Sequence, residues 1–223
     1  MTDIFLCQRK HLIGSLFLIA MLWNVSAAHA ATLPDPNFNP PNSSQAQTIA
    51  LAGGCFWGMQ AVYQHVKGVK EAISGYAGGT AETANYKTVS SGSTTHAESV
   101  KIIYDPSQVS LGEILKVFFS VAHDPTELNR QGPDRGTQYR SAIFTTTAEQ
   151  EKVAETYIAQ LQQAKVYSVP IVTKVEMLKG FYPAEDYHQN YARLHPYNAY
   201  IMINDAPKVS ALKEEFPQLY IDP

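Results

Sequence analysis

The stretch Thr48-Ile49-Ala50-Leu51-Ala52-Gly53-Gly54-Cys55-Phe56-Trp57-Gly58 decides how the domain begins. Its first five residues are typical of a short buried strand, which Gly53 and Gly54 end. A helical pattern follows at once, because apolar residues recur at steps of three and four, up to a terminating glycine: Phe56, Met59, Val62, Tyr63, Val66 and then Gly68. A strand that passes straight into a helix predicts that Cys55 lies on the first helical turn.

That position gives Cys55 a predicted chemistry. Unpaired N–H groups and the positive end of the helix dipole favour an anion, so we expect a lowered thiol pKa and a nucleophilic thiolate. The alternative is a small buried apolar residue, the usual state of a free cysteine. Phe56 and Trp57 follow, and a helix cannot bury two adjacent aromatic residues on one face. At least one of them is expected to border the surface that Cys55 faces, although plain core packing is the alternative for both.

The next 90 residues repeat the same order of elements. After the first strand and helix we expect a strand over residues 69–76, a polar loop over 80–95 and a strand over 99–104. Ser110 and Glu113 form a capping box that opens a helix reaching His123, and after a second long loop, 124–138, comes a strand over 141–146. This order is the split βαβ pattern of a ferredoxin-like sandwich.

The last third of the chain adds further elements. We expect a helix from about residue 148 to 165, a strand over 169–177 added to the sheet, and a loose helical segment over 184–195. A short strand over 199–203 and a helix over 207–216 complete the pattern. No repeat or second linker interrupts residues 47–223, so they are expected to form one domain.

The beginning of the chain has the features of an export signal. Arg9 and Lys10 precede an apolar run over residues 12–23 that is too short to span a bilayer comfortably, and Ala28-His29-Ala30 matches a cleavage site. We therefore predict a signal peptide over residues 1–30 and a flexible, proline-rich leader over 31–46. The expected location is the periplasm, without stable membrane association after cleavage. The alternative is an uncleaved membrane anchor.

Export would leave Cys55 as the one remaining cysteine, because Cys7 lies in the signal peptide. Thiols are normally paired in oxidising compartments, so a lone exported thiol needs an explanation. The chain has 223 residues, 45% of them hydrophobic, and a net charge of -3, a composition that excludes a disordered chain. Two cysteines exclude a disulfide-built scaffold, and the acidic balance argues against nucleic acid as a partner.

Three routes are open to a nucleophilic cysteine of this kind: acyl transfer, peroxide reduction and sulfoxide reduction. Acyl transfer needs a histidine base, and five histidines after residue 30 leave that route open. No pair of residues has a firm metal-ligand spacing, so no metal site is expected.

Several motifs occur together in one order along the chain. They are Gly53-Gly54-Cys55-Phe56-Trp57-Gly58, Gly75-Tyr76-Ala77-Gly78-Gly79, Tyr86, His96-Ala97-Glu98, Tyr104-Asp105-Pro106, His123-Asp124-Pro125-Thr126, Asn129-Arg130-Gln131-Gly132, Gly136-Thr137-Gln138-Tyr139-Arg140-Ser141 and Ala184-Glu185-Asp186-Tyr187-His188-Gln189. From about residue 48 to residue 200 the chain resembles the A-type peptide-methionine sulfoxide reductases.

The resemblance implies a fold and an activity. The fold is an α+β two-layer sandwich around a ferredoxin-like βαβ core, with added strands and long loops. The activity is reduction of the S epimer of methionine sulfoxide, free or in oxidised proteins, which repairs oxidative damage. Cys55 is similar to the nucleophile of the family, which becomes a sulfenic acid as methionine is released.

The resemblance also implies roles around that nucleophile. Glu98 is similar to the acid that protonates the sulfoxide oxygen, and Tyr86 and Tyr139 to the tyrosines that hydrogen-bond it. Asp134 resembles an orienting carboxylate. The residues similar to the pocket of the substrate methyl group and its surroundings are Phe56, Trp57 and Tyr191.

One departure from the family pattern concerns turnover. Many relatives carry resolving cysteines near the C-terminus, but the corresponding residues 196–203 contain none. We therefore expect an external thiol, thioredoxin-like, glutaredoxin-like or small, to restore Cys55, with no other cofactor. A cysteine amidase or acyltransferase and a non-catalytic module that binds methionine or its sulfoxide are the alternatives from other classes.

Overall fold

The computed structural model of the chain describes residues 33–40 and 45–223. The signal peptide predicted over residues 1–30 lies outside the described residues, as do residues 31–32 and 41–44 of the predicted leader. No helix in the two described ranges has both the length and the apolar character needed to cross a bilayer.

Four antiparallel strands form the centre of the fold. Their order across the sheet is β6-β1-β3-β2, so that each βαβ unit has a strand of the other unit between its own two strands. This is the interleaved arrangement of a ferredoxin-like sandwich, and it confirms the predicted α+β fold class. The elements of the two units are β1 (Gln47–Ala52), α1 (Phe56–Gln64), β2 (Val69–Ala77), β3 (Ala97–Tyr104), α3 (Leu111–Val117) and β6 (Ala142–Thr145).

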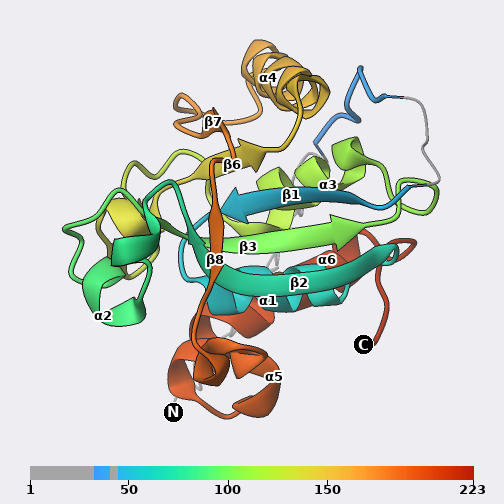
Figure 1. Ribbon diagram of the computed structural model, residues 1–223. Coiled ribbons are helices and arrows are strands. Elements are labelled where there is room, and N and C mark those ends of the chain that lie inside the picture. The colour runs from blue at the N-terminus through green and yellow to red at the C-terminus, as the bar shows by residue number, and fades with distance from the viewer. Residues whose placement is uncertain (1–32, 41–44) are drawn as a thin grey trace, which may run out of the picture. The chain divides into compact units, whose positions relative to one another are not determined.

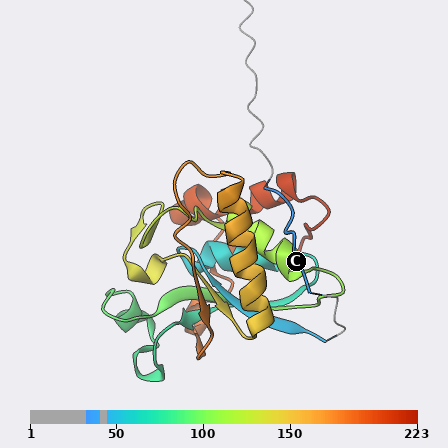
Figure 2. The ribbon, with the colours of Figure 1, turned by 90° about the horizontal axis from the view of Figure 1, so that it is seen from above.

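Two further strands extend the sheet at its edges. β7 (Lys174–Met177) pairs parallel with β6, and β8 (Phe181–Pro183) pairs antiparallel with β2. The long helix α4 (Ala148–Gln163) connects β6 to β7 and runs alongside them, as Figure 2 shows. The strand expected over residues 169–177 is therefore shorter than predicted, and β8, with only three residues, was not predicted.

The two faces of the sheet are covered differently. One face carries Ile49, Leu51, Val100 and Ile102 into the main core, where α1 and α3 lie against it. The other face is lined mainly by alanines, and Leu178 and Phe181 pack on it as the chain passes from β7 to β8 (Figure 1). Small side chains allow this crossing segment to lie close to the strands. The residues of that second cluster are Ala50, Ala52, Ala77, Ala97, Ala142 and Phe144.

Short elements occupy the loops that the sequence analysis expected. The first loop contains a turn of helix, α2 (Tyr86–Val89), and the second contains a two-stranded ribbon. In the C-terminal part, α5 and a helical turn precede α6, which packs against α1 (Figure 1). The bounds are η1 (Ala81–Thr83), η2 (Phe118–Ala122), β4 (Arg130–Gln131), β5 (Asp134–Arg135), η3 (Thr137–Tyr139), η4 (Asp186–His188), α5 (Tyr191–Leu194), η5 (Ile201–Asp205) and α6 (Ala206–Glu215).

The strand predicted over residues 199–203 is wrong, because this segment is helical and runs into α6 through η5. The Met202 N–H donates to the Asn198 carbonyl at 2.9 Å, and the Asn204 side chain donates to the Tyr200 carbonyl at 3.1 Å. Only Ile201 is buried, whereas Met202 and Ile203 are exposed. A short run of apolar residues fits both a strand and a helix, so their alternation misled the assignment.

The described part of the predicted leader, residues 33–40, follows α3 and α4. The Tyr157 hydroxyl donates to the Pro34 carbonyl at 2.9 Å, and the Lys116 ammonium lies 2.6 Å from the Asp35 carboxylate. Asn39 accepts the Gly112 N–H at 2.8 Å, at the start of α3. We expected this segment to be a flexible linker, and it makes specific contacts with two helices instead.

Candidate active site

Two glycines at the end of β1 position Cys55. Gly54 has a φ of +94°, a conformation that favours glycine, and a Cβ there would lie 2.6 Å from the Gln131 side chain. A Cβ on Gly53 would lie 2.7 Å from the His123 ring. The turn is therefore held between two side chains that leave no room for a larger residue. Cys55 follows directly and occupies the N-cap position of α1, without a capping hydrogen bond from its side chain. It therefore lies one residue before the first helical turn, on which it was predicted to lie.

The electrostatics of the Cys55 thiol differ from the prediction. The side chain is buried, with 8% of its surface exposed. Burial, followed by the charges of Glu98 and Asp205, raises the thiol pKa well above its usual range, and only the Trp57 backbone N–H opposes them. The expectation of a lowered pKa is wrong for this free state of the chain, because desolvation and nearby carboxylates outweigh the start of the helix.

Glu98 lies near the start of β3, an inner strand of the sheet, and is 2% exposed. Its Oε2 accepts the Phe56 N–H at 3.1 Å, so a free amide at the start of α1 binds this carboxyl group. Burial, with a smaller contribution from the charge of Asp134, raises the Glu98 pKa to about 8 despite that hydrogen bond. At neutral pH Glu98 is therefore mostly protonated and can donate a proton beside a thiol.

The structure brings the other predicted polar residues to the same place. Tyr86 begins α2 and Tyr139 ends η3, and both are half-buried. Burial raises the pKa of each phenol, and the charges of Glu98, Asp134 and Cys55 act on both in the same direction. Both phenols stay protonated at neutral pH and are available as hydrogen-bond donors.

Aromatic rings surround Cys55 on another side. Phe56 is buried, and the half-buried Trp57 stacks on Tyr191 with ring centres 3.8 Å apart and an interplanar angle of 11°. The Trp57 indole N–H donates to Nδ1 of His188 at 3.2 Å. The His188 ring centre lies 5.1 Å from that of Phe56 and 4.4 Å from that of Tyr86, so this buried histidine contacts Trp57, Phe56 and Tyr86. The three residues predicted to contact the substrate therefore form part of one aromatic surface.

Three residues at this place were not among the predicted site residues. Tyr200 donates a short hydrogen bond to Asp134, and its ring meets Trp57 edge-on at 6.0 Å. His188 orients Trp57, and Asp205 is a fully buried carboxyl group. Tyr200 lies within the segment that was predicted to be a strand, and Asp205 lies just after it. The predicted strand therefore gave no indication that either residue belongs to the site. His188 belongs to a motif that was quoted, but its buried position was not predicted.

The histidines do not form a base for Cys55. His123 is buried between the Phe118 carbonyl, 2.9 Å from Nδ1, and the Ser141 hydroxyl, 2.7 Å from Nε2. Burial lowers its pKa to about 4, so it is neutral. His96 hydrogen-bonds the Thr80 carbonyl at 3.0 Å. Within residues 33–40 and 45–223 no histidine hydrogen-bonds the Cys55 sulfur, and no cluster of three or more His, Cys, Asp and Glu could hold a metal ion.

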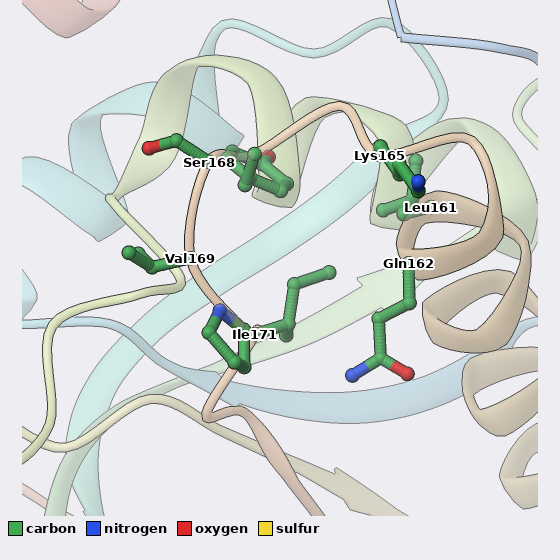
Figure 3. Close-up of a pocket in the computed structure, with 8 residues that line it drawn as sticks. Leu161, Gln162, Lys165, Ser168, Val169 and Ile171 are labelled. Carbon is green, nitrogen blue, oxygen red and sulfur yellow. The ribbon is translucent and has the colours of Figure 1, made fainter.

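A surface cavity of about 440 Å³ lies elsewhere, where α4 ends (Figure 3). None of the predicted site residues lines it, and it contains no nucleophilic thiol or carboxyl group. The lining residues are Leu161, Gln162, Lys165, Tyr167, Ser168, Val169, Pro170 and Ile171. This cavity is therefore not part of the site around Cys55.

Known proteins have similar sequences and folds. The sequence model of the family described as "Peptide methionine sulfoxide reductase" matches residues 47–220. The chain is 58% identical, over 175 residues, to peptide methionine sulfoxide reductase MsrA 2 of Mesorhizobium japonicum, covering 78% of this chain and 90% of that protein. It is 50% identical over 188 residues to the Synechocystis protein of the same name, covering 82% of this chain and 88% of that protein.

Solved structures give the same result. The crystal structure of reduced Mxr1 from Saccharomyces cerevisiae matches with a TM-score of 0.64 and 33% identity, covering 73% of this chain and 92% of that chain. Methionine sulfoxide reductase A of Corynebacterium diphtheriae matches with a TM-score of 0.60 and 35% identity, covering 71% of this chain and 78% of that chain.

Proposed function

The chain belongs to the A-type peptide methionine sulfoxide reductases, enzymes that reduce methionine sulfoxide in protein repair, and we propose that Cys55 is the nucleophile that carries out this reduction. As a peptide-methionine (S)-S-oxide reductase, it acts on the S epimer. The observation that carries the proposal is the pairing of a nearly buried thiol with an acid that is protonated at neutral pH. Glu98 has a pKa of about 8 and accepts a hydrogen bond from the backbone N–H of Phe56, the residue that follows Cys55.

The proposed reaction transfers one oxygen atom. The Cys55 sulfur attacks the sulfoxide sulfur and loses its proton, while Glu98 donates a proton to the oxygen, which gains negative charge. The sulfur–oxygen bond of the substrate and the new sulfur–sulfur bond then break as the oxygen, with its proton, passes to the Cys55 sulfur. The products are a sulfenic acid on Cys55 and a thioether, so methionine sulfur gains the two electrons that Cys55 loses. The proton released from the thiol returns Glu98 to its acid form.

The surrounding side chains have two proposed roles. Tyr86 and Tyr139, which stay protonated, donate hydrogen bonds to the sulfoxide oxygen. Asp134 accepts a hydrogen bond from the Tyr200 hydroxyl, and this bond holds the Asp134 carboxylate in position beside the site. The aromatic surface of Phe56, Trp57 and Tyr191 contacts the methyl end of the substrate. Apolar contact there directs the sulfur toward Cys55.

An external thiol completes the proposed cycle. Residues 8–223 contain no cysteine other than Cys55, so no second thiol of that stretch can attack the sulfenic acid. A thioredoxin-like or glutaredoxin-like protein, or a small thiol, attacks the Cys55 sulfur to give a mixed disulfide and water. A second thiol of the reductant then releases Cys55 as a thiol and leaves the reductant as a disulfide.

We also propose that the enzyme works outside the cytoplasm, in the periplasm. The support is the sequence pattern of residues 1–30, with two basic residues, a short apolar run and a small-residue cleavage site. Mass spectrometry of the purified protein tests it: export with cleavage predicts a mature chain that begins at Ala31.

The test of the proposed function is a reductase assay on the separated R and S epimers with dithiothreitol as reductant. We expect reduction of the S epimer only, and loss of all activity in Cys55→Ser. In the full-length chain, expressed with residues 1–30 retained, Cys7→Ser is the matched control, since Cys7 lies outside the domain, and it is expected to keep full activity. Mass spectrometry after one turnover without thiol should find a single added oxygen on the peptide that contains Cys55. Reduction by Cys55→Ser at the rate of the unaltered chain would refute the proposal.

A further inference from the structure

Asp205 is a buried carboxyl group with no role in the reaction proposed above. It is the last residue of η5 and is 0% exposed. Its Oδ1 lies 3.5 Å from the Lys208 ammonium, and its Oδ2 has no hydrogen-bond partner among the described residues. Its side chain caps no N–H of α6, although Asp205 directly precedes that helix. A buried carboxylate oxygen without a partner is costly and is rarely kept for packing alone.

The position of Asp205 is fixed against the helix that begins at Cys55. A Cβ on Gly58 would lie 2.1 Å from Oδ1 of Asp205, so the carboxylate occupies the space of the missing side chain. Gly58 is three residues after Cys55, which is about one helical turn. The carboxylate is thus packed on the same turn of α1 that holds the nucleophile.

The charged and titratable groups that act on Asp205 come from three elements. Burial raises its pKa to about 6, Lys208 of α6 lowers it, and Asp134 of β5 raises it. Tyr200, just before η5, and Cys55 both respond to its charge. At neutral pH Asp205 is therefore mostly ionised, whereas Glu98, with a pKa of about 8, is mostly protonated. Of the two carboxyl groups with the largest effect on Cys55, Asp205 is the one that is charged.

We propose that Asp205, held by Lys208 against Gly58, is a positioning residue whose buried negative charge opposes ionisation of the Cys55 thiol in the free enzyme. The inference rests on Cys55 being the nucleophile. Its consequence is protection, because a thiol reacts with alkylating agents and peroxide mainly as the thiolate. A lone thiol that works among oxidants gains from staying protonated while no substrate is bound.

The test is the rate of alkylation of Cys55 by iodoacetamide in the reduced full-length chain without substrate, measured by mass spectrometry of the Cys55 peptide from pH 4.5 to 9. The variants are Asp205→Asn and Asp205→Ser, of which the serine is too short to clash with Gly58. Glu214→Gln, which removes an exposed carboxylate of α6, is the matched control. At pH 7.5 we expect either Asp205 variant to react about threefold to tenfold faster than the unaltered chain, and the control to be unchanged.

The pH dependence separates charge from loosened packing. Below pH about 5 Asp205 is protonated in the unaltered chain, so the ratio of variant to unaltered rates is expected to approach one there and to rise through pH about 6. A ratio of one at every pH would overturn the inference. A ratio above one that does not change with pH would also overturn it, since it would report better access to the sulfur. Reductase activity in Cys55→Ser would instead overturn the proposed function, whatever the alkylation rates.

Discussion

The two sides of the site around Cys55 are built in different ways. The inner side consists of Gly53, Gly54, Cys55 and Glu98, and it is made by the end of β1, the start of α1 and the start of β3. The outer side consists of residues 184–205, which contain only short helices and turns. The inner residues are buried, whereas many of the outer ones are half-buried or exposed.

Side-chain amides hold the outer side in place, where the inner side relies on regular secondary structure. Gln189 donates to the Ala184 carbonyl at 3.0 Å and accepts the Ser74 N–H of β2 at 3.0 Å. Gln60 of α1 accepts the Asn190 N–H at 2.8 Å. Changes on the inner side should therefore affect both folding and chemistry, whereas changes on the outer side should mainly affect binding of the substrate.

The largest effect is expected from Glu98→Gln on the inner side. Loss of the acid should lower kcat/KM by roughly one to three orders of magnitude. In the unaltered enzyme activity should fall as pH rises through about 8, because Glu98 then loses the proton it donates, and this fall should be absent in the variant. Glu71→Gln, an exposed carboxylate on β2, is the control. An unchanged rate in Glu98→Gln would remove the acid from the mechanism.

The same proton links Glu98 to folding. The folded pKa of about 8 lies above that of the unfolded chain, so the folded state binds a proton that the unfolded state lacks between pH about 4.5 and 8. The unaltered chain should therefore lose stability relative to Glu98→Gln as pH rises through this window, by roughly 3 to 5 kcal/mol. Urea denaturation of both chains at pH 5 and pH 8.5 measures this change. A difference in unfolding free energy between the two chains that is the same at both pH values would contradict a raised pKa.

Gly54→Ala tests the inner turn itself. The positive φ and the contact with Gln131, 2.6 Å from a Cβ, should together cost about 2 to 4 kcal/mol of unfolding free energy, measured by urea denaturation. Gly132→Ala is the matched control, because Gly132 also has a positive φ, +53°, but nothing within 4 Å of its Cβ position. Equal losses of unfolding free energy in the two variants would mean that the close contact with the Gln131 side chain does not contribute to the cost of Gly54→Ala.

Tyr200→Phe removes a hydrogen bond where the two sides meet. The Asp134 carboxylate would lose the hydroxyl that orients it, and kcat/KM should fall about fivefold to thirtyfold, equivalent to about 1 to 2 kcal/mol. Tyr197→Phe is the control, since Tyr197 is 90% exposed. If both variants behave like the unaltered enzyme, Asp134 does not depend on Tyr200 for its position.

The smallest effect is expected from Tyr191→Leu on the outer side. Loss of the stacked ring should weaken substrate binding to the aromatic surface by about 0.5 to 1.5 kcal/mol, which raises KM about twofold to tenfold with little change in kcat. Leu194→Ala, on the exposed face of the same helix, should change neither constant. A fall in kcat without a change in KM would reverse the assignment of the two sides.

The same comparison explains how much could be predicted from the sequence. The order of strands and helices, the glycine turn and the position of Cys55 near a helix start follow from local patterns, and the structure contains them. The raised thiol pKa could not be predicted, because it depends first on the burial of Cys55 by the folded chain and then on Glu98 and Asp205, which lie 43 and 150 positions away along the chain. Tyr200 and His188 were missed for the same reason: tertiary contacts bring them to Trp57, and no periodic pattern records such contacts.

The segment over residues 33–40 changes where the working unit begins. The family match starts at residue 47, yet a chain trimmed to that point would lose the Pro34 carbonyl that Tyr157 binds and the Asn39 amide group that accepts from the first turn of α3. Removal of residues 1–30 would leave the segment over residues 33–40 in place. Proteolysis that removes residues 31–40 would delete contacts to both α3 and α4, so we expect it to lower the melting temperature without changing any residue of the active site.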